Sequence, residues 1–222
     1  MFESLSPKET NLYFQNQLSE TTSLNILNYL YYYNGAGVAA GDFNNDGLVD
    51  LYFTANQSKD HLYLNIGGFK FKDITTAANI DNTSPWTTGV TTVDINNDGL
   101  LDIYVCKIGN YNTITGHNLL FVNNGIDKDG IPIFTEEAER YGLDLRSFST
   151  QSAFFDMDKD GDLDLFVLNH SLHPNSNYGK GDNRNRIDDI SGDKLLENIN
   201  GKFIDITSQS GIFQGKIGYG LG

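Results

Sequence analysis

A short acidic pattern occurs three times in this chain and constrains its fold more than any other feature. The pattern is D-x-[DN]-x-D-G-x-x-D, and an apolar run follows it in GDFNNDGLVDLYF, VDINNDGLLDIYV and FDMDKDGDLDLFV. The first residues of the three copies, Asp42, Asp94 and Asp156, are 52 and then 62 residues apart. Repeats of this length indicate a fold built from copies of one supersecondary unit.

Each copy predicts a sheet of four strands. In the first copy we expect strands at about 36–41, 49–55, 61–66 and 69–75, because alternating apolar runs are separated there by Asn, Asp and Gly turns. A four-stranded unit of this length cannot bury both of its faces alone, so it must stack against its neighbours. The sequence therefore predicts an all-β fold, a β-propeller segment of about three four-stranded blades with repeats at about 36–80, 88–143 and 150–212.

The two ends of the chain predict additional strands. Residues 12–18, LYFQNQL, are expected to form the outer strand of a preceding or closing blade. Residues 216–222 are expected to begin the next blade, because GYGLG aligns with the GVAAG that precedes Asp42. We therefore expect residues 1–222 to be a partial propeller, a fragment of a ring of about seven blades whose remaining blades are missing.

The acidic loops predict a calcium site in each blade. Carboxylates this close together repel one another unless a cation lies among them, and oxygen-only ligands suit Ca²⁺. Gly at the sixth position permits the sharp turn, and the seventh residue would bind through its carbonyl. The candidate ligands, for about three Ca²⁺ ions, are Asp42, Asn44, Asp46, Leu48 and Asp50; Asp94, Asn96, Asp98, Leu100 and Asp102; and Asp156, Asp158, Asp160, Asp162 and Asp164.

The acidic loops allow two other interpretations. An EF-hand begins with a similar pattern but needs Glu at its twelfth position, where this chain has Phe53, Val105 and Val167. A solvated Asp and Asn turn without an ion is the simpler alternative, and three copies in phase disfavour it. In the third loop Asp162 would offer its carbonyl and leave its carboxylate outside.

The charge balance excludes several classes of partner. The chain has 29 Asp and Glu against 15 Lys and Arg, a formal net charge of -14. No basic patch would displace counterions from phosphate, so we expect no nucleic-acid partner. No stretch reaches the roughly 20 apolar residues of a membrane helix, so no membrane insertion is expected, and MFESLSPKET does not resemble a signal peptide. The single cysteine, Cys106, is expected to be a core residue.

These repeats resemble the FG-GAP or VCBS repeats of integrin α-like propellers. VAAGDFNNDGLVDLYFT and SAFFDMDKDGDLDLFVLNH are most similar to bacterial VCBS-repeat proteins related to cartilage acidic protein. The resemblance implies that the loops bind Ca²⁺ between the first two strands of each blade. It also implies an extracellular or cell-surface role in recognition or adhesion, with a protein or glycan ligand and no enzymatic activity.

The long polar insertion at residues 170–193 is a candidate contact site, and it carries Arg184 and Arg186. His170 and His173 lie in it, and without a third ligand nearby we expect them to be solvated rather than catalytic. The alternative function is a Ca²⁺-stabilised propeller scaffold of a polysaccharide-degrading enzyme, and a third is a purely structural spacer. Fold alone does not separate these.

Overall fold

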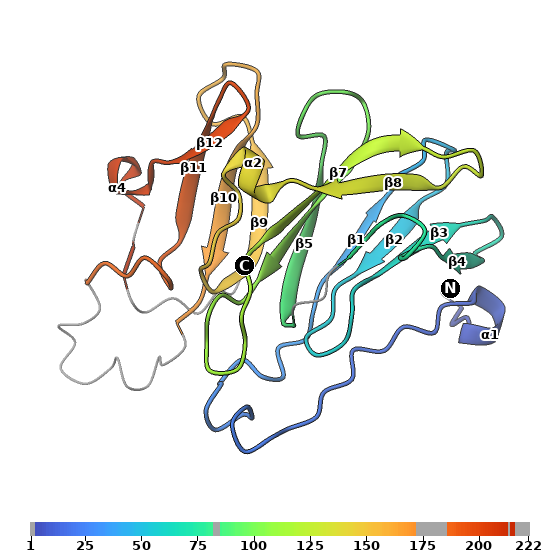
Figure 1. Ribbon diagram of the computed structural model, residues 1–222, viewed down its shortest axis with the longest axis horizontal. Helices are drawn as coiled ribbons and strands as arrows, with labels where there is room; N and C mark the ends of the chain where they lie inside the picture. Colours follow the sequence, from blue (N-terminus) through green and yellow to red (C-terminus); the bar gives the residue numbers. More distant parts are fainter. Residues whose placement is uncertain (1–2, 82–84, 172–185, 213, 216–222) are drawn as a thin grey trace.

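Three four-stranded antiparallel sheets stand next to one another in the structure (Figure 1). It is a computed structural model that describes residues 3–81, 85–171, 186–212 and 214–215. The first sheet contains β1 (Val38–Gly41), β2 (Asp50–Phe53), β3 (His61–Asn65) and β4 (Phe71–Asp73). The second contains β5 (Thr87–Val93), β6 (Asp102–Lys107), β7 (Leu119–Ile126) and β8 (Pro132–Glu136), and the third β9 (Ser149–Phe155), β10 (Asp164–Asn169), β11 (Lys194–Ile199) and β12 (Lys202–Asp205).

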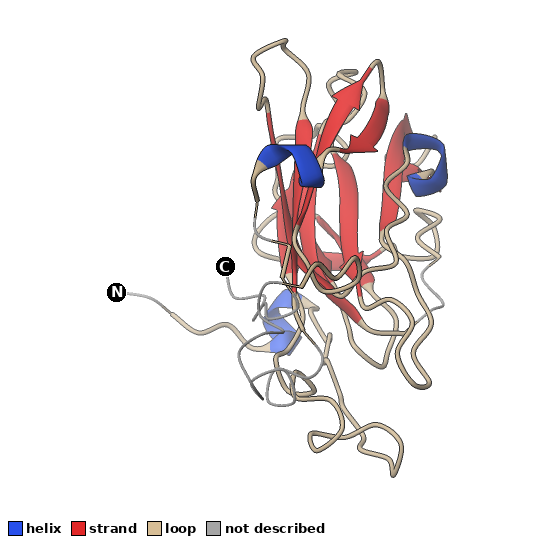
Figure 2. Ribbon diagram, turned by 90° about the vertical axis from the view of Figure 1, so that its left-hand side faces the viewer, coloured by secondary structure: helices blue, strands red, loops and turns tan. Residues whose placement is uncertain are grey.

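Each sheet is a blade in which every strand pairs with the next along the chain. Figure 2 shows the strands running in one general direction, with loops and short helices gathered at their ends. The helices in the described part of the chain are single turns, α1 (Pro7–Thr10), α2 (Ala138–Tyr141) and α4 (Thr207–Ser210). None of the described helices has the length and apolar character needed to cross a membrane. The predicted all-β segment of propeller blades is confirmed.

The blades are held together by two apolar cores, one on each side of the middle blade. Tyr52 and Leu62 of the first blade pack with Ile103 and Phe121 of the second. On the opposite face of the second blade, Tyr104 and its neighbours pack with the third blade. Because both of its faces are covered, all six residues of β6 are buried, including the predicted core residue Cys106. In β2 of the first blade, buried and partly buried residues alternate instead.

The first strands of the blades, β1, β5 and β9, are neighbours in space, and glycine permits their close approach. The backbone N–H of Gly37 donates to the carbonyl of Thr88 at 2.7 Å. A Cβ atom on Gly89 would lie 2.3 Å from the carbonyl oxygen of Thr150, which no side chain can tolerate. Glycine at position 89 therefore allows the second and third blades to meet at this point.

The prediction of a strand at residues 12–18 is wrong. This segment has no strand pairing; Phe14 instead stacks on Phe53 of β2, with ring centroids 4.9 Å apart, and contacts His61 of β3. The backbones of β2 and β3 are already paired on both sides, so the segment can only lie across their face, and it does not pair with the edge strand β4. Residues 216–222 lie outside the described part of the chain, and membership of a larger ring stays a prediction.

A second N-terminal segment, residues 24–36, crosses the ends of the blades opposite the acidic loops, and we call it the strap. Tyr29 and Tyr32 are buried in it, and both pack against Trp86 with ring centroids 5.3 Å away. Ile108 of the second blade and Phe148 of the third belong to the same apolar cluster. The strap thus covers the three blades at one end.

Candidate metal centre

The three acidic loops connect the first and second strands of their blades, at residues 42–49, 94–101 and 156–163. They lie along the upper edge of the view in Figure 1, all at the same end of the sheets. The first two loops touch, since the side-chain amide of Asn45 donates to the carbonyl of Gly99 at 3.4 Å. The sixth residue of each loop has a positive φ, 85° at Gly47 and Gly99 and 98° at Gly161, where glycine is favoured.

In the first loop, side-chain oxygens accept hydrogen bonds from the backbone that follows them. Asp42 accepts from the N–H of Asp46 at 3.0 Å and of Gly47 at 2.8 Å. Asn44 accepts from the same Asp46 N–H at 3.3 Å, and Asp46 accepts from the N–H of Leu48 at 2.8 Å. The backbone therefore wraps around the side chains that were predicted to bind the ion.

The second loop repeats this arrangement bond for bond. Asp94 accepts from the N–H of Asp98 at 3.0 Å and of Gly99 at 2.9 Å. Asn96 accepts from Asp98 at 3.1 Å, and Asp98 accepts from Leu100 at 2.8 Å. Two loops with different neighbours share one internal geometry, so the loop sequence itself determines that geometry.

The third loop brings its carboxylates closest together. Carboxylate oxygens of Asp156, Asp158 and Asp164 lie within 4.8 Å of one another, the only such acidic group among the described residues. In the first two loops Asn replaces the second of these carboxylates, and its amide nitrogen donates to the fifth residue, as from Asn44 to Asp46 at 3.0 Å. Those loops therefore offer an amide oxygen where the third loop offers a carboxylate.

Asp162 differs from its prediction. Its carboxylate is partly buried, and its Oδ1 atom is buried without a hydrogen-bond donor among the described residues. Burial, and then the charges of Asp160, Asp164 and Asp158, raise the pKa of Asp162. A buried oxygen without a donor, next to three converging carboxylates, fits a bound divalent cation.

The ninth residue of each loop has a second role, which is to join three segments of the blade. Asp50 is fully buried and accepts from the N–H of Phe43 at 3.0 Å and of Asn65 at 2.8 Å. The equivalent pairs of donors are Ile95 with Asn123 for Asp102, and Met157 with Asn198 for Asp164. Each carboxylate therefore ties the start of its loop to the second and third strands.

The environment of this ninth residue disfavours its charge. Burial is the largest cause and raises the pKa of Asp50 to about 6, with the charges of Asp46 and Asp42 acting in the same direction. The two backbone donors oppose the shift without cancelling it. Asp102 has the same pKa, about 6, for the same reasons. A cation would stabilise the ionised form at both positions.

Sequence reasoning missed three asparagines that complete these sites, Asn65, Asn123 and Asn198. Each side chain accepts from the turn after the third strand, at Gly67, Gly125 and Gly201 respectively. Each also donates to the carbonyl just before the ninth loop residue, at Val49, Leu101 and Leu163. A signal is present in the sequence, since an Asn follows the apolar run of the third strand in every repeat, but Asn there is also typical of an ordinary turn.

The prediction that His170 is solvated is wrong. The ring is fully buried at the end of β10, with Nδ1 3.0 Å from the carbonyl of Phe148 and Nε2 3.2 Å from the hydroxyl of Tyr29. Burial lowers the pKa of His170 to about 4, so the ring is neutral at physiological pH. The covering rings of the strap come from 141 residues away in sequence. His173 and Arg184 lie outside the described residues, and Arg186 is exposed.

Comparison of the sequence with known proteins supports the repeats that the sequence predicts. The model of the FG-GAP-like repeat matches residues 42–105. Human cartilage acidic protein 1 is 33% identical over 140 residues, and the mouse protein of the same name is 31% identical over the same length. These alignments cover 62% of this chain but only 20% and 21% of the relatives, so the chain matches about a fifth of their length. The predicted resemblance to the FG-GAP repeat family is confirmed.

Proposed function

We propose that this chain, a set of FG-GAP-type propeller blades, is a calcium-binding module that serves recognition or adhesion outside the cell. One observation carries the proposal: the same oxygen ligands and backbone donors recur bond for bond in the first two loops, and at the same end of the third blade three carboxylates lie within 4.8 Å of one another. In the third loop the converging carboxylates and the buried Asp162 oxygen, which has no donor among the described residues, are not explained by backbone hydrogen bonding alone. The ligand of the module would be a protein or a glycan.

The loop residues fit Ca²⁺ by their chemistry. Every predicted ligand is an oxygen, from carboxylates, asparagine amides or the carbonyls of Leu48, Leu100 and Asp162, which is the set that Ca²⁺ prefers over softer metals. About three ions would bind, one per loop. The ion would neutralise the crowded carboxylates. The ninth residue would bind the ion and, through its hydrogen bonds, link it to the second and third strands.

The role of the ions in this proposal is structural. Asp50, Asp102 and Asp164 join strands, and the buried His170 is held between a carbonyl and a tyrosine hydroxyl. Catalysis would need a base and an electrophile near one pocket. We therefore favour a recognition module without enzymatic activity over the scaffold of a polysaccharide-degrading enzyme.

The proposed location is the extracellular space or the cell surface. The names of the relatives, which refer to cartilage, support it. Calcium sites of extracellular modules typically have dissociation constants of about 10⁻⁴ to 10⁻³ M. Sites this weak would fill only where Ca²⁺ is millimolar. The net charge of -14 also argues against nucleic acid as a partner.

Isothermal titration with Ca²⁺ tests the metal part of the proposal. We expect about three sites, and Asp46→Ala, Asp98→Ala and Asp160→Ala should each remove one. Unchanged stoichiometry in all three variants would contradict the assignment. Incubation with a panel of polysaccharides tests the absence of catalysis, since release of new reducing ends that depends on this chain would favour the enzyme scaffold.

A further inference from the structure

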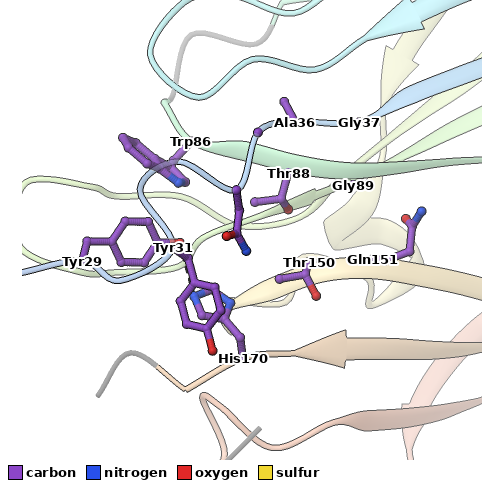
Figure 3. A pocket seen from close by; sticks show the side chains of 12 residues that line it. Tyr29, Tyr31, Ala36, Gly37, Trp86, Thr88, Gly89, Thr150, Gln151 and His170 are labelled. Carbon is purple, nitrogen blue, oxygen red and sulfur yellow. Dashed lines mark hydrogen bonds between the residues drawn. The ribbon is translucent and has the colours of Figure 1, made fainter. Parts of the chain in front are cut away.

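A cavity of about 330 Å³ lies between the strap and the starts of the innermost strands. Its walls come from Gly37 just before β1, Thr88 in β5 and Gln151 in β9 (Figure 3). The acidic loops follow the other ends of these strands, so the cavity and the loops lie at opposite ends of the blades. Its volume is at the lower end of the range for ligand pockets, about 300 to 1,000 Å³.

The cavity has a buried aromatic floor and a polar rim. Tyr29, Trp86 and His170 are almost fully buried, and Tyr31 packs on the His170 ring with centroids 4.1 Å apart. The exposed side chains of Asn34 and Gln151 also line the cavity, and the hydroxyls of Thr88 and Thr150 donate to backbone carbonyls, so they can only accept from a ligand. The aromatic rings therefore form a packed layer beneath an accessible lining of polar and small residues.

Trp86 is held in a strained backbone conformation at this cavity. Its φ is 70°, in the left-handed region that bulky residues avoid, and the Tyr29 and Tyr32 rings pack on its indole. Strained residues of this kind persist only where surrounding contacts hold them, and they concentrate at binding sites. The strain is a second feature of the cavity, independent of its volume.

The described lining contains no charged group at neutral pH. The twelve residues are tyrosine, tryptophan, asparagine, glutamine, threonine, glycine, alanine and a histidine that its burial keeps neutral. An anion or a cation entering the cavity would lose its hydration without gaining a counter-charge. The occupant should therefore be neutral, with one apolar face and several hydroxyl or amide groups.

We propose that this cavity binds a neutral sugar residue, such as the end of a glycan chain. The hydroxyl groups around a sugar ring match the amide and hydroxyl groups of the lining, and its C–H faces fit against the small residues Gly35, Ala36 and Gly37. The proposal deepens the recognition role proposed above and rests on it. It assigns the glycan to the end of the blades away from the calcium loops.

The only tryptophan of the chain provides a direct probe, because Trp86 lines the cavity. The protein is titrated in millimolar Ca²⁺ with glucose, galactose, mannose, N-acetylglucosamine, lactose and maltose, and tryptophan fluorescence is recorded. Saturation-transfer NMR on the sugar protons measures binding independently of Trp86. We expect a saturable response to at least one neutral sugar, and weaker binding of glucuronic acid and glucosamine.

Two pairs of variants locate the binding. Ala36→Leu should fill the mouth and abolish the response, whereas Ala77→Leu adds the same side chain at an exposed position outside the cavity and should leave it unchanged. Gln151→Ala should weaken binding about fivefold to tenfold through a lost hydrogen bond, and Gln209→Ala is its exposed control. Melting temperatures of all four variants verify that they are folded.

Three results would overturn the proposal: no saturable binding by either method, binding that survives Ala36→Leu, or charged sugars that bind as tightly as neutral ones. These outcomes are distinct from failure of the calcium module, which is measured by Ca²⁺ titration without any sugar. A protein that binds three Ca²⁺ ions but no neutral sugar would retain the metal proposal and lose this one.

Discussion

The side-chain amide of Asn123, in the second blade, donates a 2.8 Å hydrogen bond to the carbonyl of Phe43, in the acidic loop of the first. The backbone N–H of Asn123 also donates to Asp102 at 2.7 Å. One asparagine therefore connects the loops of two neighbouring blades. The first loop is therefore linked through Asn123 to the ninth residue of the second.

Asn123→Ala should destabilise the protein by about 1 to 3 kcal/mol, because it leaves buried carbonyls of two blades without their donor. Urea unfolding followed by circular dichroism measures this. The matched control is Asn124→Ala, the next residue of the same strand, whose side chain is exposed and bonds only within its blade. Equal losses in the two variants would show that Asn123 has no special role between blades.

Asp102→Asn and Asp98→Ala should behave differently in the presence of a chelator. Asp102 accepts two backbone donors whether or not an ion is present, so its replacement should lower the melting temperature in both conditions. Asp98 is exposed, and its replacement should lower the melting temperature mainly when Ca²⁺ is available. Thermal scans of both variants with chelator and with Ca²⁺ test this. A similar response of the two variants would contradict the separate role of the ninth residue.

His170 should make stability depend on pH below neutrality. Its pKa falls from 6.5 to about 4 on folding because the ring is buried, so the unfolded chain binds the proton more readily. Stability is therefore fully present above pH 6.5 and is lost as the pH falls toward 4. The difference between pH 7 and pH 5 should be about 2 kcal/mol.

Urea unfolding at the two pH values, in the wild type and in His170→Gln, isolates this contribution. The variant lacks the titrating ring, so it should lose less stability than the wild type between pH 7 and pH 5. In this variant the glutamine amide can still form a hydrogen bond with the Tyr29 hydroxyl. An identical pH dependence in the two proteins would show that His170 does not account for it.

The sequence was sufficient to predict the blades and the acidic loops, because both depend on local patterns. The spacing of Asp42, Asn44 and Asp46 determines the loop, and the alternation after it determines the strand. By contrast, His170 and residues 12–18 depend on tertiary contacts. Tyr29 reaches His170 across 141 residues, and Phe14 packs on the face of a blade whose central strands are already paired. No local pattern encodes such contacts.

The link between Asn123 and Phe43 was unpredictable for the same reason, since it spans 80 residues and two blades. Its acceptor is also a backbone carbonyl, which every residue possesses. Sequence therefore identifies the ligands of the loop but not the residues that connect one loop to the next.

Removal of calcium should lower the melting temperature by many degrees. The three loops together with their ninth residues hold eleven carboxylates, and their repulsion is greater in the compact fold than in an expanded chain. An ion that binds only the folded form stabilises it by about 2.7 kcal/mol per site at 100 times the dissociation constant. The ninth residues add to the effect, because a cation favours the ionised form that burial disfavours at Asp50 and Asp102.

Melting curves in excess chelator and in millimolar Ca²⁺ measure the difference, with Mg²⁺ as the control for ionic strength and charge. Curves that superimpose would mean that the loops are solvated turns and that their repeated geometry has another cause.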